Sequence, residues 1–192
     1  MRDMSTRTAS DSHDPIVEHR DELATPMIQG EKPKDRWRIG TEHEKFVYCT
    51  GDHHAPSYAE PGGIRDLLLA LTEFGWEPVY EGDNVIAMSG PDGTVSLEPA
   101  GQLELSGAPL ENLHQTCAET GRHLKQVKAI GAKTGKAFLG LGLWPDKKRS
   151  DLPIMPKGRY DIMLRHMPRV GSMGLDMMLR TCTIQVNLDY SS

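Results

Sequence analysis

The sequence predicts an α+β fold, in which an antiparallel sheet carries helices inserted between its strands. Three runs alternate polar and apolar side chains, the period typical of half-buried strands: IGTEHEKF, the segment TVSLEPAGQLELS, and TCTIQVNLDYS. Two further segments, 61–76 and 111–134, place apolar residues at helical spacing. The 192 residues are enough for one ordinary domain or part of one.

The N-terminal segment carries no clear structural pattern. Residues 1–14 read as a disordered tail, because they contain acidic residues and lack the apolar stretch of a secretory signal. The spacing from Pro15 to Gln29 permits a helix, and a charged connector then leads into the first strand. The three cysteines have no metal-ligand spacing and are odd in number, which suits a reducing cytosol, so we expect a cytoplasmic protein.

The middle of the chain contains the clearest helix signals. In 61–76, four apolar residues share one helical face and Gly75 stands where a C-terminal cap is expected. Gly90 to Gly93 (GPDG) has turn chemistry between two β-prone runs and predicts a hairpin. A second helix is expected over 111–134, followed by a buried strand in AFLGLGL and a loop that enters a short helix near Arg159. The second helix should turn an apolar stripe to the core: Leu113, Cys117, Leu124, Val127 and Ile130.

Acidic and amide side chains recur on one face of the predicted strands. Residues i and i+2 of a strand point the same way, so Glu42 and Glu44 share a face, as do Glu98 with Ser96 and Glu104 with Gln102. In the last run the polar face holds Gln185 and Asn187, and the apolar face, with Ile184, Val186 and Leu188, should rest on a core.

Clustered carboxylates repel one another unless a cation compensates for their charge, and an all-oxygen ligand set favours a hard ion such as Mg²⁺. A solvated polar face of an antiparallel sheet fits the alternation equally well. Histidines at 53 and 54 lie in a polar loop without a Cys or His partner at ligand spacing, which favours simple solvent exposure.

Four segments, in order, resemble the plant-type and proteobacterial glutamate–cysteine ligases. They are IGTEHEKF, SLEPAGQLELSGAPLENLHQTCAE, MPKGRYDIM and GLDMMLRTCTIQVNLDYSS, and the resemblance extends from about Pro33 to Ser192. It implies that residues 15–192 are the N-terminal part of a glutamine-synthetase-like catalytic domain, an incomplete form of a fold in which a curved antiparallel sheet carries the active site. Members of the family have chains more than twice as long.

The resemblance also implies a reaction and its residues. ATP phosphorylates the γ-carboxylate of glutamate, and the amine of cysteine attacks the acyl phosphate to give γ-glutamylcysteine, the first step of glutathione biosynthesis. Metal binding is carried over to Glu42, Glu44, Glu98 and Glu104, with Glu44, Glu104 and Arg159 as the catalytic residues. Arg159, Tyr160, Gln185 and Asn187 are the substrate-binding candidates; a guanidinium can hold two carboxylate oxygens at once.

Composition limits the partners. The net charge is −5 and no Lys/Arg cluster is interleaved with aromatic residues, so we expect no nucleic acid, and the absence of a long apolar run predicts no membrane partner. Glutamate, cysteine and ATP are the expected small molecules, with Mg²⁺ as the cofactor, and the oligomeric state is left open. Two alternatives remain: a truncated, non-catalytic metal-binding fragment, and a related ligase that joins glutamate to another amino acid.

Overall fold

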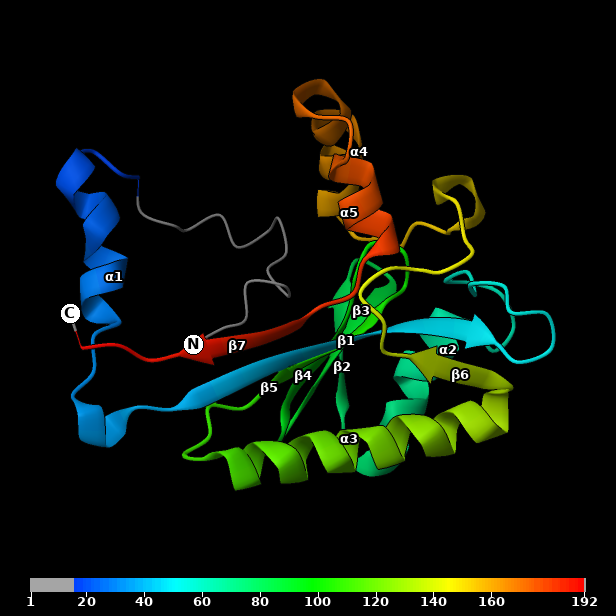
Figure 1. Cartoon of the computed structure of the whole chain (residues 1–192), viewed down its shortest axis with the longest axis horizontal. Coiled ribbons are helices and arrows are strands. Elements are labelled where there is room, and N and C mark those ends of the chain that lie inside the picture. Colours follow the sequence, from blue (N-terminus) through cyan, green and yellow to red (C-terminus); the bar gives the residue numbers. More distant parts are fainter. Residues whose placement is uncertain (1–15, 192) are drawn as a thin grey trace.

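One long strand, β1 (Ile39–Cys49), organises the sheet in the computed structural model, which describes residues 16–191 (Figure 1). The disordered tail predicted for 1–14 lies outside these residues. The other strands are β2 (Glu77–Glu81), β3 (Asn84–Gly90), β4 (Gly93–Leu97), β5 (Leu103–Gly107), β6 (Lys136–Leu139) and β7 (Ile184–Leu188). The α-helices are α1 (Thr25–Gln29), α2 (Ile64–Ala70), α3 (Leu113–Thr134), α4 (Gly158–Val170) and α5 (Gly174–Arg180).

All seven strands join one antiparallel sheet in the order β2-β3-β4-β5-β1-β6, and β7 also pairs with β1. Because β5 and β7 both pair with Glu42 and His43, they occupy opposite edges of β1. β7 therefore shares an edge with β6, which pairs with Phe46 to Cys49. The predicted α+β class and antiparallel sheet are confirmed, whereas the glutamine-synthetase-like identity of the sheet stays a prediction.

The two faces of the sheet have different environments. Figure 1 shows α3 running along one side of the sheet and α4 with α5 on the other. The core lies under the first side, where Leu97, Leu103 and Leu105 are at most 2% exposed and belong to one apolar cluster with residues of α2 and α3. The period-two pattern therefore leaves the carboxylates of β1 and β5 on the other face.

Helix α3 confirms the prediction for 111–134, but the face it buries is different. The side chain of Asn112 accepts hydrogen bonds from the backbone N–H groups of His114 and Gln115 and so caps the N-terminus. Leu113 is 71% exposed, whereas Glu119 and His123 are buried. The predicted apolar stripe is confirmed for Val127 and Ile130 but wrong for Leu113, Cys117 and Leu124, which are exposed. Glu119 turns inward in their place and accepts a hydrogen bond from the backbone of Ala108, next to β5.

Two further expectations need correction. The helix permitted for 15–29 is split into a 3₁₀ turn over Arg20–Ala24 and the short α1, since Pro26 at the start of α1 has no N–H to bond the preceding turn. The apolar side of β7 does not rest on a core within residues 16–191: Ile184, Val186 and Leu188 are 71%, 56% and 68% exposed.

The predicted hairpin at Gly90 to Gly93 is present, and Gly93 is its constrained position. Its φ is 108°, and an added Cβ would lie 2.1 Å from the backbone oxygen of Ser106 on β5. We expect Gly93→Ala to lower the free energy of unfolding by at least about 1 kcal/mol, measured by urea denaturation. Gly121→Ala is the matched control, because Gly121 lies inside α3 and no atom of the described part of the chain lies within 4 Å of the position of an added Cβ; it should stabilise the protein by about 0.5–1 kcal/mol. Equal effects of the two changes would contradict this assignment.

Candidate functional site

Three carboxylates converge on the face of the sheet opposite α3. Glu44 of β1 stands directly across from Glu104 of β5, and Glu98 follows the end of β4. One oxygen from each of the three lies within 4.8 Å of the others. The pairing of β1 with β5 thus brings Glu44 to Glu98 and Glu104, which lie more than 50 positions later in the chain, and unites three of the four predicted metal ligands.

Burial and neighbouring like charges disfavour the ionised forms of Glu98 and Glu44. Burial, and next the charge of Glu104, raise the pKa of Glu98 to about 8, although Lys157 and Arg159 oppose the shift. Burial also raises the pKa of Glu44, and the hydrogen bond from the backbone of Thr183 opposes it. A cation at the cluster would reverse this penalty, because an adjacent positive charge favours the ionised carboxylates.

Each carboxylate is also held in place by a neighbour. Glu44 accepts hydrogen bonds from the N–H of Thr183 at 2.8 Å and from its hydroxyl at 3.3 Å. Glu104 accepts one from the hydroxyl of Ser106 at 2.7 Å, and Glu98 lies 3.4 Å from the guanidinium of Arg159. A set of three positioned carboxylates fits a hard divalent ion such as Mg²⁺, which prefers oxygen ligands.

Glu42 lies in a separate group. Its Oε1 accepts hydrogen bonds from the amide of Gln185 at 3.2 Å and from that of Asn187 at 2.9 Å, and Gln185 also donates to Asn187 at 3.0 Å. The predicted common face of Glu42 and Glu44 is confirmed, but the two amides of β7 satisfy the Glu42 carboxylate. The role of Glu42 as a metal ligand stays a prediction.

Arg159 brings a cation to the edge of the carboxylate cluster. Its Nη2 is within 3.4 Å of Glu98, whereas its buried Nε has no hydrogen-bond partner within residues 16–191. Tyr160 lies beneath the guanidinium, at 5.2 Å from ring centroid to Arg159 Cζ. The hydroxyl of Tyr160 donates to the backbone oxygen of Leu97, and the residue is only 1% exposed.

Several residues that support this site were not among the predicted site residues. Lys157 is 3% exposed and donates to the backbone oxygen of Leu97 at 2.7 Å. Gln102 is buried and joins the site to the end of α5, since its amide donates to the carbonyl of Thr181 at 3.0 Å. Two of the supporting residues could have been found from the sequence. Lys157 lies in the MPKGRYDIM motif with Arg159, and Thr183, which bonds to Glu44, lies on the polar face of the last predicted strand.

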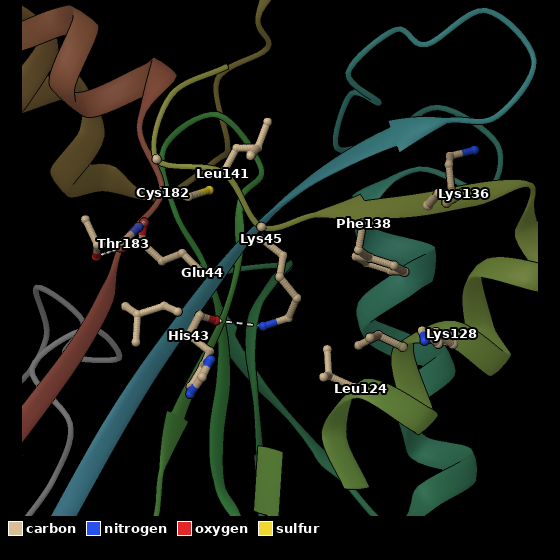
Figure 2. A pocket seen from close by; sticks show the side chains of 15 residues that line it. His43, Glu44, Lys45, Leu124, Lys128, Lys136, Phe138, Leu141, Cys182 and Thr183 are labelled. Carbon is tan, nitrogen blue, oxygen red and sulfur yellow. Dashed lines mark hydrogen bonds between the residues drawn. The ribbon is translucent and has the colours of Figure 1, made fainter. Parts of the chain in front are cut away.

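A cavity of about 610 Å³ opens where β6 and β7 separate along β1 (Figure 2). His43 and Lys45 line it and alternate along β1 with Glu42 and Glu44, and Glu44 lies at its margin with its carboxylate turned to Thr183. Burial lowers the pKa of Lys45 to about 8. Neighbouring positions of β1 therefore serve different sites: Lys45 lines the cavity, whereas the carboxylate of Glu44 belongs to the cluster. The remaining lining comes from α3, β6, and residues 140–142 and 182–184.

Comparison with known proteins identifies the family. Residues 38–192 match the model of glutamate-cysteine ligase family 2. The chain belongs to this family. It is 55% identical over 174 residues to glutamate–cysteine ligase A from Oryza sativa subsp. japonica, and 54% to the enzyme from Medicago truncatula. Both alignments cover 90% of this chain, with 35% of the rice protein and 34% of the Medicago protein. The chain therefore spans about a third of the length of the curated relatives it matches.

The predicted resemblance is confirmed by this match, but the predicted cytoplasmic location is wrong. The rice, Medicago and Arabidopsis thaliana relatives are all named chloroplastic, and the Arabidopsis protein is 55% identical to the chain. The cytoplasmic prediction was based on the odd number of cysteines. This number indicates only a reducing compartment, and it does not distinguish the cytosol from a plastid. None of the helices within residues 16–191 combines the length and the apolar character needed to cross a membrane.

The raised pKa of Glu98 makes stability depend on pH. The folded protein retains a proton on Glu98 up to about pH 8, whereas in the unfolded chain this carboxyl returns to its ordinary pKa of 4.5 and releases the proton earlier. Without divalent cations, the free energy of unfolding should therefore fall as the pH rises from 4.5 to about 8. Glu98→Gln should flatten this part of the profile, measured by urea denaturation.

The control for this experiment is Glu77→Gln, because Glu77 is exposed on β2. It should keep the slope of the parent protein. Equal slopes for the parent and Glu98→Gln would contradict the assignment of the proton to Glu98.

Proposed function

We propose that the chain is the N-terminal part of an ATP-dependent glutamate–cysteine ligase with a glutamine-synthetase-like catalytic domain. In this reaction the γ-carboxylate of glutamate attacks the γ-phosphorus of ATP and releases ADP. The amine of cysteine then attacks the acyl phosphate, releasing phosphate and a proton and giving γ-glutamylcysteine. Family membership and the names of the relatives support the reaction. The single observation on the structure that carries the proposal is the convergence of Glu44, Glu98 and Glu104.

The carboxylate cluster is the proposed Mg²⁺ site. When bound, the ion would neutralise phosphate oxygens, which is the main electrostatic demand of phosphoryl transfer. The contribution of Glu44, Glu98 and Glu104 is to fix three oxygen donors, held by Thr183, Arg159 and Ser106 respectively. Preorganised ligands avoid the cost of rearrangement during the reaction.

Arg159 is the proposed anchor for an anionic group of the substrate. The guanidinium is beside Glu98, so an oxyanion that it holds would lie next to the cation site. The N–H at Nε of Arg159 has no hydrogen-bond acceptor within residues 16–191. A planar guanidinium with spare donors is suited to a carboxylate or a phosphate.

The other predicted substrate residues receive different roles. We propose that Gln185 and Asn187 act through Glu42, whose carboxylate they both hold, and that this trio forms the rim of the substrate site. Tyr160 is proposed to support Arg159 from below, because its hydroxyl bonds to Leu97 and its ring is buried. The substrate would then meet the guanidinium rather than the phenol.

Removal of one carboxylate charge tests the metal site. In the full-length enzyme, Glu104→Gln should weaken Mg²⁺-dependent turnover by about 100-fold or more, given that even changes around metal ligands cost about 10–100-fold. The assay follows γ-glutamylcysteine formation against Mg²⁺ concentration. Glu111→Gln, at an exposed position that precedes α3, is the control and should leave the curve unchanged. Parent-like turnover by Glu104→Gln would exclude the proposed metal role.

A conservative change tests the anchor. Lysine keeps the charge of Arg159 but loses the planar pair of donors, so Arg159→Lys should raise the KM for glutamate or for ATP by about 10-fold or more. Steady-state kinetics in each substrate would show which of the two it holds. An Arg169→Lys control should keep both KM values, since Arg169 is exposed at the end of α4. Unchanged KM values in Arg159→Lys would refute the anchor.

Amine competition tests the choice of acceptor. The full-length enzyme is incubated with glutamate, ATP and equal concentrations of cysteine and other amino acids, and the products are identified by mass. Predominant γ-glutamylcysteine is the expected result. Predominance of another γ-glutamyl product would instead support the related ligase.

A further inference from the structure

A second cluster of metal-binding side chains lies at the far end of β1, outside the carboxylate site. Cys49 ends the strand, and the loop that follows folds back and brings His54 and Glu60 to its thiol. The sequence-based expectation that the histidines of this loop lack a Cys partner is wrong for His54. Its ring reaches Cys49 because the backbone at His53 adopts a left-handed conformation, with φ of 61°.

The three donor atoms have the spacing of a tetrahedral zinc centre. The Nε2 of His54 is 3.3 Å from the Sγ of Cys49 and 3.1 Å from the Oε1 of Glu60, and the sulfur and the oxygen are 3.9 Å apart. Zn–N and Zn–O bonds of about 2.0 Å with a Zn–S bond of about 2.3 Å place tetrahedral donors about 3.3–3.5 Å apart. All three side chains therefore need only small shifts to share one ion.

The surroundings orient these donors as they do in zinc sites. The other ring nitrogen of His54, Nδ1, lies 2.6 Å from the carboxylate of Asp52, and this pairing fixes the ring so that Nε2 faces Cys49 and Glu60. Glu60 is held through its second oxygen, which accepts hydrogen bonds from the N–H of Ser57 at 2.8 Å and from its hydroxyl at 3.0 Å. The site is reachable from solvent, because the His54 side chain is 48% exposed.

We propose that Cys49, His54 and Glu60 bind a Zn²⁺ ion, with Asp52 as the residue that orients His54. A thiolate, an imidazole and one carboxylate form a borderline-soft set, which selects zinc over the Mg²⁺ favoured by the all-oxygen cluster. Binding releases the proton of the Cys49 thiol to solvent, together with the Nε2 proton of His54 when the ring is an imidazolium, and it requires no redox partner. The ion would tie the loop 50–60 to the end of β1, and a water or another ligand would complete the four positions.

This arrangement fits a metal better than it fits a nucleophile. Cys49, His54 and Asp52 are ordered like a Cys-His-Asp triad, but Glu60 occupies the same ring nitrogen that a general base would use. Cys49 is also only 8% exposed. The thiol thus faces its two co-ligands and the side chain of Lys136 on β6, whose positive charge favours the thiolate form that binds a metal.

Zinc titration of the untagged protein, saturated with Mg²⁺, tests the proposal. Calorimetry with a competing chelator should show one Zn²⁺ bound per chain, and Co²⁺ should give the intense thiolate-to-metal absorption of a Cys ligand. Cys49→Ser should abolish both signals, and Asp52→Asn should weaken zinc binding by about 10–100-fold. Far-UV circular dichroism checks that both variants are folded.

Two matched controls separate this site from other ligands. Cys117→Ser removes an exposed cysteine on α3, and Glu104→Gln disrupts the carboxylate cluster; both should keep parent-like zinc affinity and the cobalt signal. Zinc binding that survives Cys49→Ser, that is lost in Glu104→Gln, or that is absent from the parent protein would overturn the proposal. None of these outcomes depends on ligase activity, so the proposed function and the zinc site can fail independently.

Discussion

The pairing of β1 with β5 is the constraint on which the candidate site depends. Successive side chains of β1 point to opposite faces, so one eleven-residue strand presents Glu44 to the carboxylate cluster and Lys45 to the cavity beside α3. The register fixes Glu44 opposite Glu104, and a slip of one residue would place Lys45 on the carboxylate face and Glu44 on the face covered by α3. The buried leucines of β5 hold that register, because Leu103 and Leu105 can only face the core while Glu104 faces away from it.

The charges on the two faces have different consequences. On the carboxylate face, burial of like charges costs free energy, and the same closeness that makes Glu98 hard to ionise makes a shared cation favourable. Arg159 and Lys157 supply only part of the compensation, and both come from one segment at the start of α4. On the face covered by α3, burial lowers the pKa of His123 to about 3 and that of Lys45 to about 8, so burial disfavours the charged forms of both side chains.

The sequence predicts features that depend on local geometry and misses those that depend on loops and neighbours. Alternation within each run, with the leucines assigned to the core, predicts that Glu44, Glu98 and Glu104 lie on the other face of the sheet. It does not separate Glu42 from the cluster, because that separation depends on two amides supplied by β7, more than 140 positions later in the chain. The inward turn of Glu119 likewise depends on the backbone N–H of Ala108, to which it bonds just past the end of β5. The contact of His54 with Cys49 depends on the left-handed backbone conformation of His53. Tertiary partners of this kind leave no periodic signal.

The open row of Ile184, Val186 and Leu188 has a consequence for handling the protein. Within residues 16–191, β7 is paired only with β1, so one side of its backbone and one face of its side chains are both accessible. Free N–H and C=O groups beside β-branched side chains are a template for adding strands from other molecules. Self-association should consequently begin at β7 and rise steeply with protein concentration. Substitution of one of these three residues by lysine should reduce it more than any change in the core.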